Sequence, residues 1–245
     1  MDNYRLLIKL ARPLVNFIWP LQIINRNKFQ EGKGVYICNH YSVFDANHFL
    51  TDLFDNRLNI LMKKEAMTKG IGGKFLNYVG AIPITRGELD LKAMKKCLDV
   101  LRNDKPLLVF PEGTRNKTGS REMLEFKDGP VVFALKTKSS IYPFIYDKPV
   151  RFFRKSYLIC GNRIDLSEYY DKPINDVREQ ATMLVRFEME KLQQELFSLL
   201  ANKRALKMAV RQDKIDRKNI KLAHKKAKEL SKKARKDSKK AKVEA

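Results

Sequence analysis

Residues 31–200 alternate between short continuous apolar runs and longer amphipathic stretches. Continuous apolar runs of this length are typical of buried strands, and they predict strands at residues 34–38, 57–62, 78–84, 106–110, 140–146 and 156–162. Helical periodicity predicts helices at residues 44–54, 88–102, 128–138 and 174–200. Because strands and helices alternate along the chain, we expect an α/β fold with a largely buried mixed sheet flanked by helices.

Pro83 and Pro143 each lie in a predicted strand after its first residue. Proline lacks the N–H group that a residue of a central strand donates to its neighbour. We therefore expect an edge position or a strand end around Pro83, and an edge or irregular position around Pro143.

Both ends of the chain depart from this pattern. Residues 4–25 are apolar with interleaved cations and two prolines, and they lack the about 20 apolar residues that a spanning helix needs. We expect a pair of interfacial helices with Trp19 at headgroup depth, and an amphipathic helix packed on the protein's own core is the alternative. From Ala201 onward the Lys- and Ala-rich composition favours a protruding, partly frayed helix.

Charge is distributed unevenly along the chain, which carries a net charge of +22. Residues 201–245 hold 18 basic and five acidic residues, a net charge of +13, and residues 1–200 hold the remaining +9. Such a surface attracts membranes with acidic lipids, nucleic acid or acidic proteins. No recognised nucleic-acid-binding motif accompanies the charge, and a solvated tail without a specific partner is a further alternative.

The three cysteines are Cys38, Cys97 and Cys160, an odd number without C-x-x-C spacing. This pattern argues against a disulfide framework or a zinc site and is typical of a reducing cytoplasm. The chain has three histidines in all, which leaves little material for a metal site. We expect neither a metal ion nor another cofactor.

A histidine and an aspartate follow the predicted strand at residues 34–38 with H-x-x-x-x-D spacing. A histidine at this position points into the cleft above the sheet, where open α/β sheets bind ligands. Asp45 can return beneath the imidazole of His40, hold one ring nitrogen protonated and leave the other to take a proton. We interpret the pair as a general base and its orienting acid, and a structural histidine is the alternative.

Further cations follow two other predicted strands. Arg86 comes after the strand at residues 78–84, and Glu112-Gly113-Thr114-Arg115 comes after the strand at residues 106–110. Gly113 permits a positive φ or a close approach to a ligand, and the Arg115 guanidinium can bind a phosphate through two hydrogen bonds. Taken alone, the Glu112 to Arg115 block is better explained as a strand-to-loop turn with a local ion pair. The alternative for Arg86 is a surface arginine after a strand.

Four blocks occur in a fixed order: His40 to Asp45, Gly80 to Arg86, Glu112 to Arg115, and the segment around Pro143. With these blocks the chain resembles the glycerolipid acyltransferase superfamily over about residues 5–200. The resemblance is closest to the 1-acyl-glycerol-3-phosphate (lysophosphatidic acid) acyltransferases. It implies the fold of that superfamily, with membrane-interface helices at residues 1–30, an acyltransferase domain at residues 31–200 and a Lys-rich tail at residues 201–245.

The resemblance also implies an activity. A fatty acyl group would pass from an acyl thioester to the free hydroxyl of 1-acyl-glycerol-3-phosphate, giving phosphatidic acid for phospholipid biosynthesis. His40 and Asp45 would be catalytic, and the substrate-binding residues would be Arg86, Glu112, Gly113, Thr114 and Arg115. Backbone amides around Gly113 and Thr114 are candidate donors to the oxyanion.

Several choices stay open within and beyond this activity. The acyl donor is acyl-carrier protein or acyl-coenzyme A, and the acceptor is lysophosphatidic acid, glycerol-3-phosphate or another lysophospholipid. We expect a peripheral or monotopic protein on an anionic membrane surface, at the cytoplasmic face of the cell membrane, without a nucleic acid partner. A basic nucleic-acid-binding protein is the alternative of another class.

Overall fold

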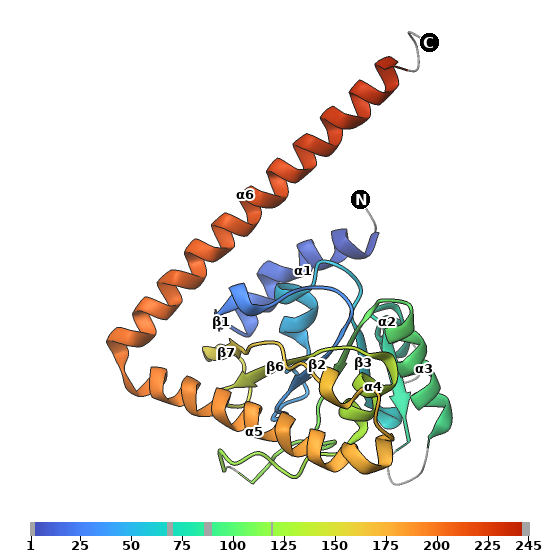
Figure 1. The fold of residues 1–245 in the computed structure, drawn as a ribbon. Coiled ribbons are helices and arrows are strands. Elements are labelled where there is room, and N and C mark those ends of the chain that lie inside the picture. The colour runs from blue at the N-terminus through green and yellow to red at the C-terminus, as the bar shows by residue number, and fades with distance from the viewer. Residues whose placement is uncertain (1–2, 68–70, 86–89, 119, 242–245) are drawn as a thin grey trace.

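The computed structural model describes residues 3–67, 71–85, 90–118 and 120–241. These residues form a seven-stranded sheet with helices on both faces (Figure 1), which confirms the predicted α/β fold. The strands are β1 (Leu21–Ile24), β2 (Gly34–Cys38), β3 (Asn59–Lys63), β4 (Ala81–Ile84), β5 (Pro106–Val109), β6 (Ile141–Tyr146) and β7 (Ser156–Cys160). The α-helices are α1 (Asn3–Ile18), α2 (Ile71–Tyr78), α3 (Leu91–Arg102), α4 (Gly129–Thr137), α5 (Ile174–Ala201) and α6 (Lys203–Ala241). The short helical turns are η1 (Arg26–Lys28), η2 (Phe49–Leu53), η3 (Lys64–Ala66) and η4 (Ser167–Tyr169).

The order of the strands brings the candidate loops together. The sheet runs β1-β7-β6-β2-β5-β3-β4, and its neighbouring strands are parallel except for the antiparallel pair β6 and β7. Strand β2 lies between β5 and β6, with Ile37 opposite both Val109 and Pro143. The loops that follow β2, β5 and β6 therefore leave the sheet at the same end of these parallel strands.

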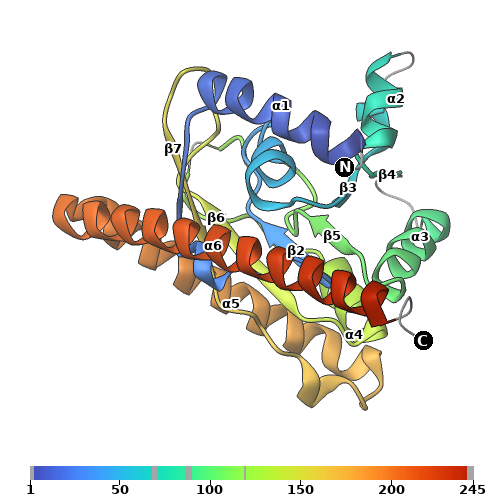
Figure 2. The same cartoon turned by 90° about the horizontal axis from the view of Figure 1, so that it is seen from above.

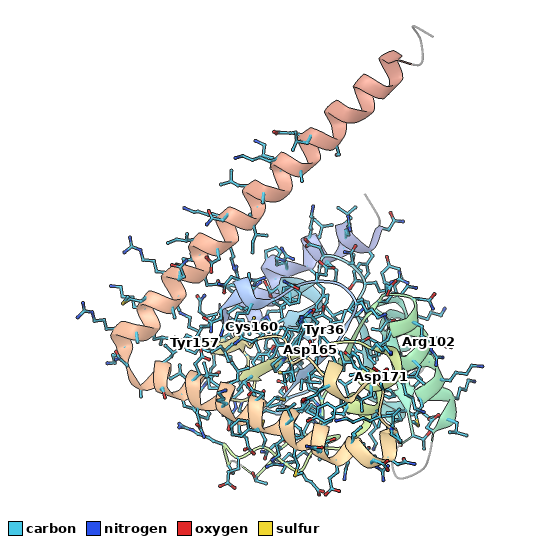
Figure 3. All side chains as sticks on the ribbon, in the orientation of Figure 1. Tyr36, Arg102, Tyr157, Cys160, Asp165 and Asp171 are labelled. Carbon is cyan, nitrogen blue, oxygen red and sulfur yellow. The ribbon has the colours of Figure 1, made fainter. Side chains whose placement is uncertain are left out.

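Side chains alternate between the two faces of the sheet and so build two hydrophobic clusters. On β2, Val35 and Ile37 pack with residues of α3, α4 and α5. Tyr36 and Cys38 point to the other face, where they pack with α1 and η2. Figure 3 places Tyr36 in the interior of the molecule. Burial on both faces explains why β2 appears in the sequence as a continuous apolar run.

The amino-terminal segment differs from the expected pair of interfacial helices. A single helix, α1, accommodates Pro13, and the chain then enters strand β1, which pairs with β7. Pro20 lies between the two elements. Ile23 and Ile24 pack into opposite hydrophobic clusters, and this alternation requires a strand. The expected second helix is therefore an edge strand of the sheet.

Pro83 and Pro143, which lie inside strands, have different outcomes. Pro83 lies in the edge strand β4, as expected. Pro143 lies in β6, between β2 and β7, so the expectation of an edge position was wrong. The amide of Gly161 donates to the Pro143 carbonyl at 2.9 Å, while Pro143 has no N–H to return this bond. Only one hydrogen bond at the end of the β6–β7 pairing is lost, which makes an interior proline tolerable.

Two predicted boundaries shift in the structure. The strand expected at residues 78–84 begins only at Ala81, because residues up to Tyr78 form helix α2. The helix expected at residues 44–54 is a series of turns that ends in the π-helical turn η2. Residues 78–84 are mostly apolar, and a short apolar run does not by itself separate strand from helix.

The Lys-rich segment forms the long helix α6, which extends away from the rest of the molecule (Figure 1). Its first turns are packed: Leu206 and Ala209 contact a hydrophobic cluster. Asp213 is buried, with Arg26 at 3.8 Å and Arg217 at 3.2 Å. The composition boundary at residue 201 therefore does not end the packed domain. Beyond these turns, the side chains drawn in Figure 3 project from α6 into open space.

Candidate active site

The loop after β2 holds the predicted histidine–aspartate pair. His40 Nδ1 and Asp45 Oδ2 are 3.0 Å apart, and the same carboxylate oxygen accepts hydrogen bonds of 2.7 Å from the amides of Tyr41 and Ser42. An ionised carboxylate only accepts hydrogen bonds, so it fixes the imidazole proton on Nδ1. The His40 side chain retains 15% exposure while that of Asp45 is fully buried. The arrangement leaves Nε2 of His40 as the ring nitrogen available to a substrate.

Two aromatic residues fix this pair from neighbouring strands. The ring of Phe110, at the end of β5, stacks on the His40 ring with centroids 4.1 Å apart. The hydroxyl of Tyr146, the last residue of β6, donates to the Asp45 carbonyl at 2.9 Å. Because these contacts restrain the ring and the aspartate backbone, the imidazole is held in one orientation.

The loop after β5 holds the backbone of His40 on both sides. Glu112 Oε1 accepts from the His40 amide at 2.7 Å, and the Asn116 amide donates to the His40 carbonyl at 2.7 Å. The second oxygen of Glu112 accepts from the Leu124 amide at 3.0 Å. Glu112 is only 3% exposed, so both of its oxygens serve the protein's own backbone. It positions His40, whereas the sequence predicted a substrate contact.

Electrostatics at Glu112 agree with this structural role. Burial raises the pKa of the Glu112 carboxyl above its usual value. The amides of Leu124 and His40 and the nearby imidazole act in the opposite direction, because they favour the charged form. A buried carboxyl with two backbone donors is a fixed structural acceptor.

Asn39 joins the loop of the His–Asp pair to β6. Its side-chain amide donates to the Tyr146 carbonyl at 3.0 Å and its oxygen accepts from the Tyr146 amide at 2.8 Å. The side chain thus continues the hydrogen-bond pattern between β2 and β6 past the end of β2. Sequence reasoning did not single out Tyr146 or Asn116, whose contacts with the loop depend on the folded sheet.

The remaining residues of the block after β5 are more open. Gly113 has a φ of 64°, in the region that glycine adopts readily, and its amide donates to the Phe110 carbonyl at 3.0 Å. That amide is therefore engaged and does not serve an oxyanion. Thr114 and Arg115 are exposed, and the guanidinium of Arg115 makes no ion pair within the described residues. Arg86 lies outside the described residues.

Cys38 is close to His40 in sequence but is not arranged as a nucleophile. Its thiol is buried and lies 3.4 Å from Asn39 Oδ1. Burial raises the pKa of the Cys38 thiol well above its usual value. Because the thiolate is the reactive form, Cys38 acts as a small core residue.

A cavity of about 660 Å³ lies at the amino-terminal end of the parallel strands. Its lining includes Asn59, Ala81 and Pro106, the first residues of β3, β4 and β5. His40 lies two residues after Cys38, the last residue of β2, so this cavity and the loop of the His–Asp pair are at opposite ends of parallel strands. The cavity is therefore separate from the histidine–aspartate pair.

The chain is similar to a known family and to several known proteins. The profile of the Acyltransferase family matches residues 20–147, more than half of the 245 residues, and this segment includes the loops after β2 and β5. A 1-acyl-sn-glycerol-3-phosphate acyltransferase from Helicobacter pylori is 30% identical over 132 residues, 53% of this chain and 55% of that protein. The 1-acyl-sn-glycerol-3-phosphate acyltransferase from Borreliella burgdorferi is 33% identical over 163 residues, 62% of this chain and 63% of that protein.

The chain thus spans between half and two thirds of the length of these curated relatives. The crystal structure of the 1-acyl-sn-glycerophosphate acyltransferase from Thermotoga maritima shares the fold, with a TM-score of 0.54 and 17% identity, over 78% of this chain and 79% of that chain. Among the described residues, no helix combines the length and apolar character that crossing a bilayer requires. On the family profile and these relatives, the chain belongs to the acyltransferase family.

Proposed function

We propose that the protein transfers a fatty acyl group from an acyl thioester to the free hydroxyl of 1-acyl-glycerol-3-phosphate, giving phosphatidic acid. The observation that carries this proposal is the His40 imidazole held 3.0 Å from a fully buried Asp45 carboxylate. The activity named for the relatives from Helicobacter pylori and Borreliella burgdorferi supports the choice of acceptor.

The chemistry requires removal of a proton from an alcohol. His40 Nε2 takes this proton while the hydroxyl oxygen attacks the thioester carbonyl, and Asp45 stabilises the imidazolium that forms. The tetrahedral intermediate then collapses, the C–S bond breaks and the imidazolium returns the proton to the leaving thiolate. General-base assistance of this kind is typically worth about 10²–10⁴-fold in rate.

The exposed cation beside the pair suits the phosphate of the acceptor. Arg115 lies in the loop that holds His40, between Glu112 and Asn116. It is exposed and has no ion-pair partner within the described residues, so its guanidinium is available for a bidentate phosphate contact. The Thr114 amide is our candidate oxyanion donor, because the neighbouring Gly113 amide is already bonded to Phe110. Arg86 lies outside the described residues, and its role as a second phosphate ligand stays a prediction.

The acceptor is a lipid, so the enzyme must meet it at a membrane. Helix α1 exposes Leu10, Leu14 and Phe17, which are 68%, 60% and 70% exposed. Arg5 and Lys9 lie on the same helix and are exposed. An apolar helix face with adjacent cations suits the headgroup region of an anionic bilayer. We therefore assign the protein to the cytoplasmic membrane surface as a peripheral enzyme.

The function is tested by assaying purified protein with three acceptors: lysophosphatidate, glycerol-3-phosphate and lysophosphatidylcholine. Radiolabelled acyl-coenzyme A and acyl-carrier protein are compared as donors, and the His40→Ala variant measures the background. We expect product with lysophosphatidate that the variant does not form. Acylation of glycerol-3-phosphate alone would move the proposal to another acceptor, and RNA binding without acyl transfer to any acceptor would refute it.

A further inference from the structure

The loop between β6 and β7 carries two exposed phenylalanines at its tip. Phe152 and Phe153 are 55% and 66% exposed, and they form the corner of a tight turn whose ends, Arg151 and Arg154, pair as an antiparallel bridge. Phe153 has a φ of 54°, a conformation that bulky side chains rarely adopt. Exposure and strain are both unfavourable in water, and such outliers are a reason to look for a function.

These phenylalanines are joined by ring contacts to the catalytic loop. The Phe152 ring lies 5.3 Å from Trp19 and 5.3 Å from Phe44, between ring centroids. Trp19 and Phe44 are themselves 4.8 Å apart. Phe44 directly precedes Asp45, so any surface that receives Phe152 also receives the loop of the His–Asp pair.

The same turn is fixed to the end of α1. The Phe153 amide donates to the Ile18 carbonyl at 2.7 Å, and the Phe17 and Phe153 rings are 5.8 Å apart. Figure 2 shows the β6–β7 loop beside this end of α1. We call the resulting surface the aromatic rim, and its members are Phe17, Trp19, Phe44, Phe152 and Phe153.

Cations surround the tip of the rim. Arg151, Arg154 and Lys155 are exposed and flank the two phenylalanines in sequence. Aromatic rings that face outward between basic side chains match the interface of an anionic bilayer, where rings lie at the acyl boundary and cations meet the headgroups. An acidic protein would satisfy the cations but would leave two exposed phenylalanines in contact with polar groups.

We infer that the aromatic rim inserts into the interface of an anionic lipid bilayer and sets the catalytic loop at the membrane surface. The inference rests on the proposed function for its purpose, because an inserted rim lets the acceptor lipid reach His40 without leaving the bilayer. The turn of β6–β7 and the end of α1 then act as one insertion element. Because Phe152 contacts Phe44, insertion of this element couples membrane contact to the loop that holds the general base.

Trp19 provides a direct probe because it is the one tryptophan of the chain and belongs to the rim. Vesicles of phosphatidylcholine with phosphatidylglycerol should shift its emission to shorter wavelength, and brominated phosphatidylcholine in those vesicles should quench it. Unchanged emission on vesicles that co-sediment the protein would overturn the inference, because the protein would then bind through another surface.

The double variant Phe152→Ser/Phe153→Asn tests the tip itself, since asparagine tolerates the positive φ. We expect at least about tenfold weaker partitioning onto phosphatidylglycerol-containing vesicles. The matched control is Phe187→Ser, which removes a ring of 59% exposure on α5 and should leave partitioning unchanged. Equal binding of the double variant and the unmodified protein to these vesicles would overturn the inference.

Activity measurements separate this inference from the proposed function. On a short-chain, monomeric lysophosphatidate the double variant should turn over like the unmodified protein, and on vesicles its KM should rise while kcat stays. Inactivity of both proteins toward every acceptor would refute the function and leave the vesicle result standing. A loss confined to acyl-carrier protein as donor, with unchanged vesicle binding, would show an acidic protein at the rim and overturn membrane insertion.

Discussion

At the scale of single residues, one carboxylate oxygen organises the candidate site. Asp45 Oδ2 accepts from the His40 ring and from the amides of Tyr41 and Ser42. The other oxygen, Oδ1, is buried and has no hydrogen-bond partner among the described residues. Two backbone donors compensate for burial of the charge, and that charge can in turn stabilise a protonated imidazole.

The first prediction concerns this pair. His40→Ala and Asp45→Asn should each lower kcat at least about a hundredfold, because one removes the base and the other removes the charge that supports it. Asparagine can keep the two backbone hydrogen bonds through its side-chain oxygen, so the Asp45→Asn variant should stay folded. Turnover is measured beside thermal unfolding. A folded His40→Ala variant with near-normal turnover would exclude His40 as the base.

The second prediction concerns Glu112, whose two oxygens accept from His40 and Leu124. In Glu112→Gln one of these amides faces an NH₂ group, and an unsatisfied buried donor costs about 1–3 kcal/mol. We expect the free energy of unfolding in urea to fall by this amount and kcat to fall with it. Glu125→Gln, at an exposed position, is the control. Unchanged stability of Glu112→Gln would show that the clamp on His40 does not depend on both oxygens.

At the scale of elements, a second buried pair ties helices to one another. His48 Nδ1 and Asp52 Oδ2 are 3.0 Å apart, and Asn16 of α1 donates to Asp52 Oδ1 at 2.9 Å. Arg26 of η1 donates to the Asp52 carbonyl at 2.6 Å. Asp52 therefore joins η2 to α1 and η1.

The third prediction follows from the pKa of Asp52. Burial favours a higher pKa, but hydrogen bonds from His48, Asn16 and Thr51 outweigh it, and the pKa is lowered below the usual 3.8. As pH falls, the unfolded state therefore takes up a proton on Asp52 before the folded state does. Stability from Asp52 is complete above about pH 4 and is lost as pH falls through the folded pKa.

Urea unfolding between about pH 6 and pH 3 tests this dependence. Asp52→Asn should flatten the acid side of the profile, since its amide does not titrate. Asp55→Asn, which replaces a carboxylate of 58% side-chain exposure, is the control. Parallel profiles for Asp52→Asn and the unmodified protein would contradict the assignment.

The fourth prediction concerns the contact between α6 and the sheet. Asp213 lies between Arg26 and Arg217, and breaking a buried ion pair by removing one partner typically costs about 3–5 kcal/mol. Truncation after Ala201 should therefore lower the free energy of unfolding by several kcal/mol. Truncation after Lys221 keeps Asp213 and should leave stability nearly unchanged. If both truncations are equally stable, α6 does not contribute to the packed domain.

At the scale of the whole molecule, the surface combines apolar and basic features. Helix α1 and the aromatic rim share one end of the molecule (Figure 2), and α6 carries much of the net charge of +22 away from the sheet (Figure 1). Apolar insertion is independent of lipid charge, whereas the attraction of α6 to anionic lipid is weakened by salt. The two contributions can therefore be separated experimentally.

The fifth prediction separates them by removing residues 222–245, which hold ten basic and three acidic residues. At low salt the truncated protein should bind anionic liposomes more weakly than the full-length protein. This difference in binding should shrink as salt rises, because screening weakens the attraction of the full-length protein to the lipid. Turnover on detergent-dispersed lysophosphatidate and binding to neutral liposomes should hardly change. Equal binding of both proteins to anionic liposomes at low salt would make the end of α6 a solvated appendage.

The sequence by itself determined the fold class and the order of most strands and helices. Strands such as β2 and β5 are buried on both faces, so their apolar runs are visible without a structure. It also determined the His–Asp pair, because Asp45 lies only five residues from His40 and their contact is local. Proline positions were less informative: Pro143 is inside the sheet because one missing donor falls at the end of a pairing.

Only the tertiary structure decided how the pair is held and which surface surrounds it. Glu112 meets His40 across 72 residues of chain, and Tyr146 meets Asp45 across 101. Such contacts depend on the order of the strands in the sheet, which brings together residues that are far apart in sequence. The same reason applies to strand β1, to the docking of Asp213 and to the aromatic rim, where residues far apart in sequence meet only once the sheet has formed.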